Sequence, residues 1–580
     1  MKSSFFEYHV ASSGLMTARA NLQVTSHNVA NAETQGYSRQ YAEQRASWPL
    51  TLYNGKGMIG TGSEVYGIGQ HRDFYLDKKY WTDMGTLGEY QAKKQQLDIT
   101  ESIFNDLSDN GLSGVYNNLF TQLQSLSENS GNATYRTNLI QSANSLISTV
   151  KLEANALRKQ QQDINSEIKS IAELINSIGN QIASLNRQIV TFENDGSRAN
   201  DLRDSRARLV DKLSSYVNTE VFEKEMNAEY AAGKFPEPED RGRSDKHYVV
   251  MINGYELVNH FNASQFTIRP REDGYDGYTG GAFTQPDKTD PDPTHAHNML
   301  DNIGLYDIYV GGNKFDIYSR TLSGQLKGLV DVRDGNGATT TIYKPGTTTP
   351  YPYETTYKGI PYYMNKLNEF VQTLARAFNE GKDHDGKDIP GVVGLVNGHE
   401  RNPDEPDPGD LLFFTMKESG PPMPITQAEI DAMGNALDYE RMNIFNFALN
   451  PDIEQNPNML GAALEGSPDN PSDESDNRVI LGLLKLREYA GLFSQGKGSD
   501  FLNSISSDLG VAVKQASKFE SNYNDVTSMV DQQRMSVSGV DINEEMINMV
   551  KYQQLYQAAA KLMNVIDSIY DQTVNRLGNF

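Results

Sequence analysis

The stretch that decides the fold runs from residue 146 to residue 192 and reads LISTV KLEANALRKQ QQDINSEIKS IAELINSIGN QIASLNRQIV TF. Within it, a mostly apolar set of residues recurs at intervals of three and four. The set is Leu146, Val150, Glu153, Leu157, Gln160, Ile164, Ile168, Ile171, Ile175, Ile178, Ile182, Leu185, Ile189 and Phe192. This spacing places the set on one face of a helix, so it predicts a long helix with a coiled-coil seam.

A short turn and a second amphipathic stretch follow the long helix. Asn194-Asp195-Gly196 supplies the turn, and Ala199, Leu202, Leu209 and Leu213 then share one helical face. Because the joint is so short, the two helices are expected to lie antiparallel.

Two further segments repeat the helical register. One has a stripe at Met364, Leu367, Val371, Leu374 and Phe378, with Pro361 near its start and Gly381 at its end. The other has Ile505, Leu509, Ala512, Ala516, Phe519, Tyr523, Val526 and Val530. Since one helix cannot bury its own stripe, these segments are expected to pack with residues 146–192 in a bundle.

Between the helical segments the pattern changes to strands and turns. Tyr248–Val258 reads as a hairpin around Asn253-Gly254, and residues 304–317 read as another around Gly311-Gly312. Residues 382–481 are rich in Pro, Gly and Asp, with a short strand expected at 411–414.

The sequence therefore predicts a multidomain α+β protein, a long helical bundle that carries β-rich insertions. The expected parts are a terminal helical segment (1–50 with 535–580), a long bundle (51–214 with 323–381 and 482–534), a β-rich insertion (215–322) and a β-rich or irregular insertion (382–481). Helices as short as the terminal ones are marginal alone, so the ends are expected to order fully only when neighbours bury them.

Composition excludes several classes of function. Asp and Glu total 76 against 52 Lys and Arg, a net charge of −24, which disfavours nucleic acid as a partner. The absence of cysteine excludes disulfides and thiolate chemistry. No run of apolar residues is long enough to predict a membrane span, and residues 1–9 lack the apolar core of a secretion signal peptide, so any export is expected to use another route.

The N-terminal segment reads GLMTARANLQVTSHNVANAETQGYSRQ from Gly14 to Gln40. Leu15, Leu22 and Val29 recur every seven residues on one helical face. Asn31 and the stretch to Gly36 are expected to end the helix, with Gly36 free to adopt positive φ. From Tyr37 onward the chain is expected to be extended.

The C-terminal segment begins at Ser536 and reads SVSGVDINEEM before a helix. Asp541 or Asn543 can cap this helix, and Glu544 and Glu545 suit its positive N-terminus. Its expected seam is Ile542, Met546, Met549, Tyr552, Tyr556, Ala559, Met563, Ile566 and Tyr570.

These two ends closely resemble those of the axial proteins of the bacterial flagellum. The N-terminal signature of that family resembles residues 28–39, NVANAETQGYSR, and its closing segment resembles SGV at 538–540, EEM at 544–546 and YQQLYQAAA at 552–560. The Tyr37-Ser38-Arg39 triplet, the Ser-Gly-Val triplet and internal segments at 200–211, 324–334 and 367–381 are similar to the branch that joins hook to filament.

The resemblance implies a structural subunit and not an enzyme. Such a protein would be secreted unfolded through the flagellar type III apparatus with an export chaperone. It would form a ring of its own copies at the hook tip, on hook protein and beneath hook-associated protein 3, outside the cell. By this resemblance, the residues expected at the assembly interface are Leu15, Leu22, Asn28, Val29, Asn31, Gly36, Tyr37, Ser38, Arg39, Gly539, Val540, Glu544, Glu545, Met546, Met549, Tyr552, Tyr556 and Met563.

No cofactor, metal or catalytic residue is expected. His295 and His297 could ligate a metal but lie in a Pro- and Asp-rich loop, and Asp383–Asp388 has Gly394 where a calcium loop needs its last Glu, so an ordinary turn is favoured. Two alternatives stay open: a hook or distal-rod protein, and a flagellum-borne enzyme with a catalytic insertion at 215–322 or 382–481.

Overall fold

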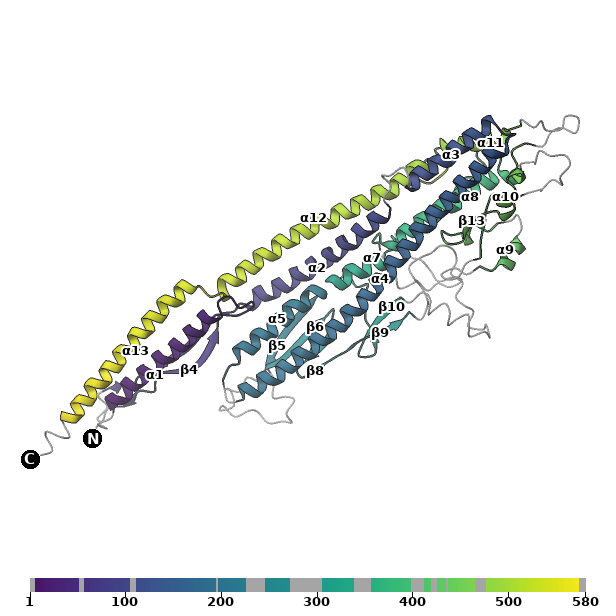
Figure 1. The fold of residues 1–580 in the computed structure, drawn as a ribbon. Helices are drawn as coiled ribbons and strands as arrows, with labels where there is room; N and C mark the ends of the chain where they lie inside the picture. Colours follow the sequence, from purple (N-terminus) through teal and green to yellow (C-terminus); the bar gives the residue numbers. More distant parts are fainter. Residues whose placement is uncertain are drawn as a thin grey trace, which may run out of the picture. The chain divides into compact units, whose positions relative to one another are not determined.

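A computed structural model describes residues 6–51, 57–104, 111–194, 197–225, 246–271, 305–337, 356–397, 411–418, 425–433, 437–464 and 476–572. The described chain forms two compact units (Figure 1). The first contains residues 1–87, 174–265 and 522–580, and the second contains 88–173 and 266–521. Helices and small separate sheets make up both units, so the predicted α+β class is confirmed. The four predicted domains stay a prediction.

Three long helices contribute residues to both units. They are α2 (Phe74–Ile103), α4 (Ala133–Glu193) and α12 (Gly498–Ser538). α4 confirms the long helix predicted at 146–192. Its seam is buried from Leu146 to Ile189 apart from the half-buried Leu185, but Phe192 at the end is 62% exposed. The prediction that Phe192 belongs to the buried seam is therefore wrong: its side chain lies in the last turn of the helix and is mostly exposed, whereas Ile189 and Glu193 in the same turn are buried.

The first unit contains further helices and strands besides the parts of these three helices. They are α1 (Phe6–Ala30), β1 (Gln40–Ala46), β2 (Leu50–Thr51), β3 (Met58–Ile59), β4 (Ser63–Gln70), α5 (Asn200–Tyr216), β5 (Thr219–Glu225), β6 (Lys246–Ile252), β7 (Tyr255–Asn259), β8 (Asn262–Ala263) and α13 (Ile542–Asp571). β1 pairs antiparallel with β4, and β2 with β3. The order β5-β6-β7-β8 makes a four-stranded sheet.

α5 lies antiparallel to the end of α4, as predicted. Arg203 pairs with Glu193 at 2.7 Å, and Arg206, farther along α5, bonds Asn186, which lies earlier on α4. The predicted apolar face is only partly right: Leu213 is buried, whereas Leu202 and Leu209 are half-buried. Several polar residues of α5 are buried as well, a point that matters for the site below.

The hairpin predicted around Asn253-Gly254 is present. It joins β6 to β7 through two residues with φ of +46° and +82°, the conformation that an Asn-Gly turn favours. The sheet packs on α4, where the position a Cβ would take on Gly179 lies 3.4 Å from Leu257.

The second unit contains a larger set of short elements. They are α3 (Leu112–Glu128), β9 (Phe266–Pro270), β10 (Tyr306–Val310), β11 (Asn313–Lys314), α7 (Gln325–Asp334), α8 (Ile360–Glu380), η3 (Leu395–Asn397), β12 (Phe414–Met416), α9 (Gln427–Met433), η4 (Tyr439–Arg441), β13 (Phe447–Leu449), α10 (Pro451–Gln455), η5 (Pro457–Met459), α11 (Arg478–Leu484) and η6 (Lys485–Arg487). β10 and β11 flank Gly311-Gly312, as predicted. The strand expected at 411–414 instead begins at Phe414.

The core of the second unit forms around α8. Its whole predicted stripe is fully buried, and Gly381 ends it in the left-handed conformation. Aromatic rings from α3 meet it edge-on, with Tyr116 5.8 Å from Phe370 and Phe120 5.9 Å from Phe378. The stripe predicted on α12 is buried at Ile505, Leu509, Ala516 and Val530 and half-buried at Ala512, Tyr523 and Val526. Phe519 is 43% exposed, but its ring packs against Tyr90 of α2, with the centroids 4.9 Å apart.

Residues 383–388 form the ordinary turn that was favoured. The Asp383 carboxylate accepts hydrogen bonds from the backbone N–H groups of Asp385 and Lys387, and Gly386 has φ of +77°. His295 and His297 lie outside the described residues.

Candidate assembly site

The two terminal helices, α1 and α13, pack side by side (Figure 1). The pairing of sequence ends that the terminal motifs predicted is therefore present. On α1 the predicted face is half-buried at Leu15, Leu22 and Val29. The fully buried residues are a neighbouring, smaller set: Ala11, Thr17, Ala18, Asn21, Val24, Thr25 and Asn28.

Small buried residues let α1 approach the β1–β4 hairpin closely. Thr17 donates a hydrogen bond to the backbone oxygen of Ser63 at 3.2 Å. A Cβ on Gly62, which has φ of +116°, would lie 1.9 Å from the Ser13 hydroxyl. Only glycine fits there, both for its conformation and for the space.

Asn28 connects the end of α1 to the chain that follows it. Its side-chain amide donates to the backbone oxygen of Gln40 at 2.8 Å and to Glu545 at 3.3 Å. Its amide oxygen accepts from the backbone N–H of Gln40 and from the hydroxyl of Tyr37. Asn28 is 1% exposed, so all these bonds are shielded from water. Burial, with the nearby carboxylates of Asp201, Asp204 and Glu545, raises the pKa of Tyr37.

The turn between α1 and β1 has the predicted form. Asn31 donates from its side chain to the His27 carbonyl, and Gly36 has φ of +74°. A Cβ on Gly36 would lie 2.4 Å from Arg208 of α5, so the turn rests directly on that helix.

Arg39 joins this turn to the start of α13. Its guanidinium donates to Glu545 at 2.7 Å and to both oxygens of Glu544 at 2.7 and 3.2 Å. Its backbone N–H donates to the carbonyl of Ser538, the last residue of α12. Burial by itself would lower the pKa of Arg39, but the two carboxylates outweigh it and raise that pKa. Glu545 is only 2% exposed, so this carboxylate is shielded from water, whereas the Glu544 side chain is 56% exposed.

Gly539 and Val540 form the joint between α12 and α13. The Gly539 N–H donates to the Met535 carbonyl at 2.8 Å, and a Cβ there would lie 2.4 Å from the same oxygen. Val540 is half-buried. Asp541 then caps α13 by accepting from the Asn543 N–H, which settles the choice between the two predicted caps.

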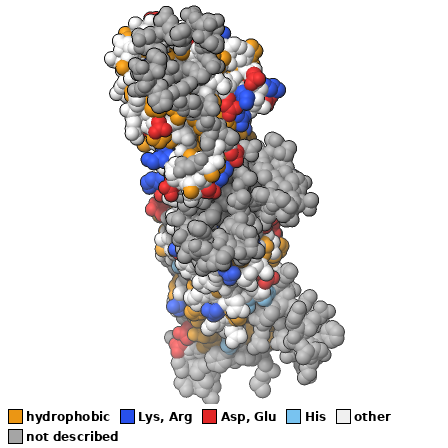
Figure 2. Space-filling model, turned by 90° about the vertical axis from the view of Figure 1, so that its right-hand side faces the viewer, with side chains coloured by type: hydrophobic (Ala, Val, Ile, Leu, Met, Phe, Trp, Pro, Cys, Tyr) orange, Lys and Arg blue, Asp and Glu red, His pale blue; other side chains and the backbone are white. Residues whose placement is uncertain are grey.

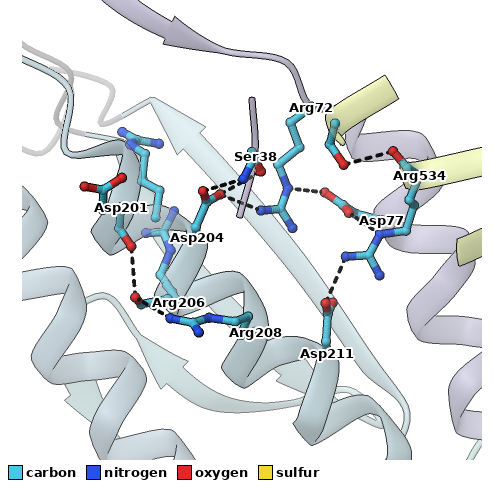
Figure 3. Close-up of polar contacts among 12 residues, drawn as sticks. Ser38, Arg72, Asp77, Asp201, Asp204, Arg206, Arg208, Asp211 and Arg534 are labelled. Carbon is cyan, nitrogen blue, oxygen red and sulfur yellow. Dashed lines mark hydrogen bonds and ion pairs between the residues drawn. The ribbon is translucent and has the colours of Figure 1, made fainter. Parts of the chain in front are cut away.

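A network of buried charges, which the sequence analysis missed, holds the same turn to the rest of the first unit (Figure 3). Ser38 donates its N–H and its hydroxyl to Asp204 of α5, both at 2.8 Å. Arg72 donates to Asp204 at 3.3 Å and to Asp77 at 2.6 Å. Arg534 of α12 contacts Asp77 at 3.1 Å (Figure 3).

The network continues from Arg534 to Asp211 of α5 at 2.8 Å, and Asp211 accepts from the Trp81 indole at 2.6 Å. Burial raises the pKa of Asp204 despite its bonds from Ser38. Burial alone would lower the pKa of Arg72, but Asp77 outweighs it and raises that pKa. The four segments that meet here are far apart in sequence. Asp204 and Asp211 lie seven residues apart on α5, and the sequence analysis considered only the apolar face of that helix. The seven-residue spacing of the two carboxylates is the sequence signal that could have indicated the network.

The predicted residues of α13 divide into two groups. Met549, Tyr552 and Met563 are half-buried on the side of Ile566, which is 5% exposed. Met546 and Tyr556 are 56% and 36% exposed. A further apolar group, which the sequence analysis also missed, borders the same buried face: Leu555, Leu562, Val565 and Ile569 are each 50–55% exposed.

In the part of the chain that the structure describes, no helix combines the length and the apolarity that a membrane span requires. The same described residues hold no cluster of three or more His, Asp or Glu placed to bind a metal ion. On the face in Figure 2, acidic and basic side chains are interspersed, and no large field of one sign appears among the described residues.

Comparison with known proteins identifies the family to which the chain is similar. A family model described as the flagellar hook-associated protein FlgK helical domain matches residues 97–394, just over half of the chain. Models of the flagellar basal body rod protein and of the C-terminal part of the rod proteins FlgEFG match residues 9–37 and 531–577.

Relatives that match this chain over nearly its whole length share the same description. "Flagellar hook-associated protein 1" of Bacillus subtilis is 25% identical over 100% of this chain and 99% of its own. The protein of that description in Salmonella typhimurium is 25% identical over 97% of this chain and 98% of its own. A solved structure of the flagellar hook junction protein FlgK from Burkholderia pseudomallei has the same fold, with a TM-score of 0.53, 13% identity and coverage of 80% of this chain and 100% of that one. The chain belongs to the flagellar hook-associated protein FlgK family.

Proposed function

We propose that this chain is a structural subunit of the bacterial flagellum that forms the junction ring between hook and filament. It polymerises through its paired terminal helices. Family membership supports the flagellar part of the proposal, as do relatives described as hook-associated over their whole length.

The observation that carries the assembly mechanism is the incomplete burial of α13. One side of this helix contacts α1, yet Met546, Ile547, Val550 and the group from Leu555 to Ile569 are half or more exposed. Burying one such half-exposed side chain contributes about 1 kcal/mol. Burial against neighbours would thus stabilise each contact by several kcal/mol, which favours a polymer over an isolated chain.

The proposed interface residues have two roles. Asn28, Asn31, Gly36, Tyr37, Ser38, Arg39, Gly539, Val540, Glu544 and Glu545 shape the pair of helices within one copy. Leu15, Leu22, Val29, Met549, Tyr552 and Met563 pack between the helices, and Met546 and Tyr556 are left for a neighbouring copy.

The proposed partners are further copies of this chain, hook protein, hook-associated protein 3 and a flagellar export chaperone. The proposed location is outside the cell, after unfolded export. A chain without cysteine suits that route because its refolding needs no oxidant. The role is structural and not enzymatic.

Rod-protein models match both ends of the chain, so a hook or distal-rod role is the second candidate. The match of residues 97–394 to the FlgK helical domain favours the junction, because that segment lies outside the rod-type ends.

Deletion of the gene followed by electron microscopy tests the proposal. Cells without the protein are expected to carry bare hooks and to lose flagellin into the medium, and the intact gene in trans is expected to restore filaments. Normal filaments on the deletion strain would contradict a junction role.

A further inference from the structure

Two joints connect the terminal helices to the rest of the first unit. One is the turn between α1 and β1, which includes Ser38 and Arg39, and the other is the short break between α12 and α13. The backbone N–H of Arg39 donates to the carbonyl of Ser538, the last residue of α12, at 2.8 Å. The two joints, which are far apart in the sequence, therefore meet directly.

The buried charges in Figure 3 connect the same two joints by a second route. Starting from the first joint, the N–H and the hydroxyl of Ser38 donate to Asp204, both at 2.8 Å, and Arg72 donates to Asp204 at 3.3 Å. Arg72 also donates to Asp77 at 2.6 Å, and Asp77 pairs with Arg534 at 3.1 Å. Arg534 lies one helical turn before the end of α12, and so it completes the route to the second joint.

Together with the bond between the two joints, these contacts close into a ring. We call it the joint ring; its members are Ser38, Arg39, Arg72, Asp77, Asp204, Arg534 and Ser538. Its charged side chains between the joints are largely buried: those of Asp77 and Asp204 are each 5% exposed, and those of Arg72 and Arg534 are 19% and 13% exposed. Ion pairs in such surroundings are screened much less than pairs at the surface.

Arg534 attaches the end of α12 to two other helices. Its guanidinium contacts Asp77 of α2 at 3.1 Å and Asp211 of α5 at 2.8 Å, and it lies over the ring of Tyr80 at 4.2 Å. Among the described residues, its ion pairs go to α2, α5 and its own helix, and none goes to α1 or α13. Removing it would take away a cation that Asp77 and Asp211 share, and loss of a buried partner costs more than loss of an exposed one.

From this arrangement we infer that Arg534 is a positioning residue for the pair of α1 and α13, although its ion pairs reach neither helix. It holds the end of α12 in place, so that Ser538 can accept from Arg39. Arg39 then pairs with Glu544 and Glu545 at the start of α13. The consequence for assembly rests on the proposed function, whereas the positioning itself is a property of one copy.

Backbone hydrogen exchange of the purified full-length chain tests this coupling, because exchange reports the local opening of each helix. Arg534→Ala is expected to raise the exchange rates of α13 amides about tenfold. Arg534→Lys should raise them less, because lysine keeps the charge but lacks the planar fork that serves two carboxylates. In an Arg39→Ala background, Arg534→Ala should raise the same rates only about threefold or less, since Arg39 is the step through which Arg534 acts.

The control for general destabilisation is Ile252→Ala, at a fully buried position on β6 in the same unit. It weakens the unit through a different element, so its effect on α13 should be the same with and without Arg39→Ala. If Arg534→Ala does not fold, Arg534→Lys is measured in the same two backgrounds.

Three results would overturn the inference. The first is an effect of the Arg534 variants that is equally large in both backgrounds, as for Ile252→Ala. The second is exchange of α13 amides that the Arg534 variants leave unchanged, and the third is α13 amides without protection in the wild type. Filament formation on cells tests the proposed function separately, so each claim can fail without the other.

Discussion

At the scale of single residues, Glu545 holds the terminal pair together. It is buried, and it receives hydrogen bonds from Arg39 and Asn28, two residues more than 500 positions earlier in the chain. The sequence analysis placed all three at the interface, on the strength of the terminal motifs. It could not predict that they contact one another, because a spacing pattern says nothing about which distant residue faces which. The Asp204 and Arg534 network was missed for the same reason.

Arg39→Ala is expected to destabilise the terminal pair by about 3 kcal/mol, because it leaves a buried carboxylate without its ion pair. Arg45→Ala is the matched control: its partner is Glu64, both side chains are about half exposed, and the loss should stay below about 1 kcal/mol. Hydrogen exchange of α13 amides measures both. Equal protection in the two variants would contradict the role given to Arg39.

Asp334 gives the second unit a defined response to acid. Burial would raise its pKa, but Arg271 and Arg333 outweigh burial and hold the pKa at about 2, below the ordinary 3.8. The stability from this ionised group is therefore present above pH 3.8 and is lost as the pH falls toward 2. The shift corresponds to about 2 kcal/mol.

Asp334→Asn should accordingly lower the free energy of unfolding at pH 7 by about 2 kcal/mol or more. The difference between the wild type and the variant should shrink between pH 4 and pH 2. Urea titrations at several pH values check this, and a difference that stays constant down to pH 2 would refute it.

At the scale of elements, periodicity predicted the long helices well. α4 and α8 follow their apolar stripes because three- and four-residue spacing reports the 3.6-residue turn directly. The failure at Phe192 has a physical cause: a stripe shows which face is apolar, not how much of each side chain on it is covered. On α13 the sequence analysis predicted the residues that face α1 and overlooked the exposed Leu555, Leu562, Val565 and Ile569, since one apolar stripe was enough to explain a pair of helices.

Gly381→Ala should be more harmful than Gly386→Ala. Both residues have positive φ, which costs an L-residue about 1 kcal/mol. At Gly381 a Cβ would also lie 2.8 Å from the Val392 carbonyl, whereas nothing lies within 4 Å at Gly386. We expect losses of about 3 and about 1 kcal/mol in thermal or chemical unfolding. Similar losses in both variants would show that the end of α8 tolerates a side chain.

At the scale of the whole molecule, the exposed apolar residues of α13 connect the stability of the free chain to its proposed assembly. Helices that bury only one side gain little from their own chain, so α1 and α13 should be the least stable elements of a free copy. Limited proteolysis of the monomer is expected to remove about 50 residues from each end and to spare the rest. The same ends should resist protease in isolated flagella. Equal resistance of the ends in a demonstrated monomer would count against assembly-dependent ordering.

The central claim is that this chain sits at the hook–filament junction. Gold-labelled antibody against the purified chain, applied to isolated flagella with hooks attached and viewed by electron microscopy, tests it most directly. The account predicts one narrow band of label where hook meets filament. Label along the hook, or on the rod below it, would contradict the claim and identify a hook or rod protein instead.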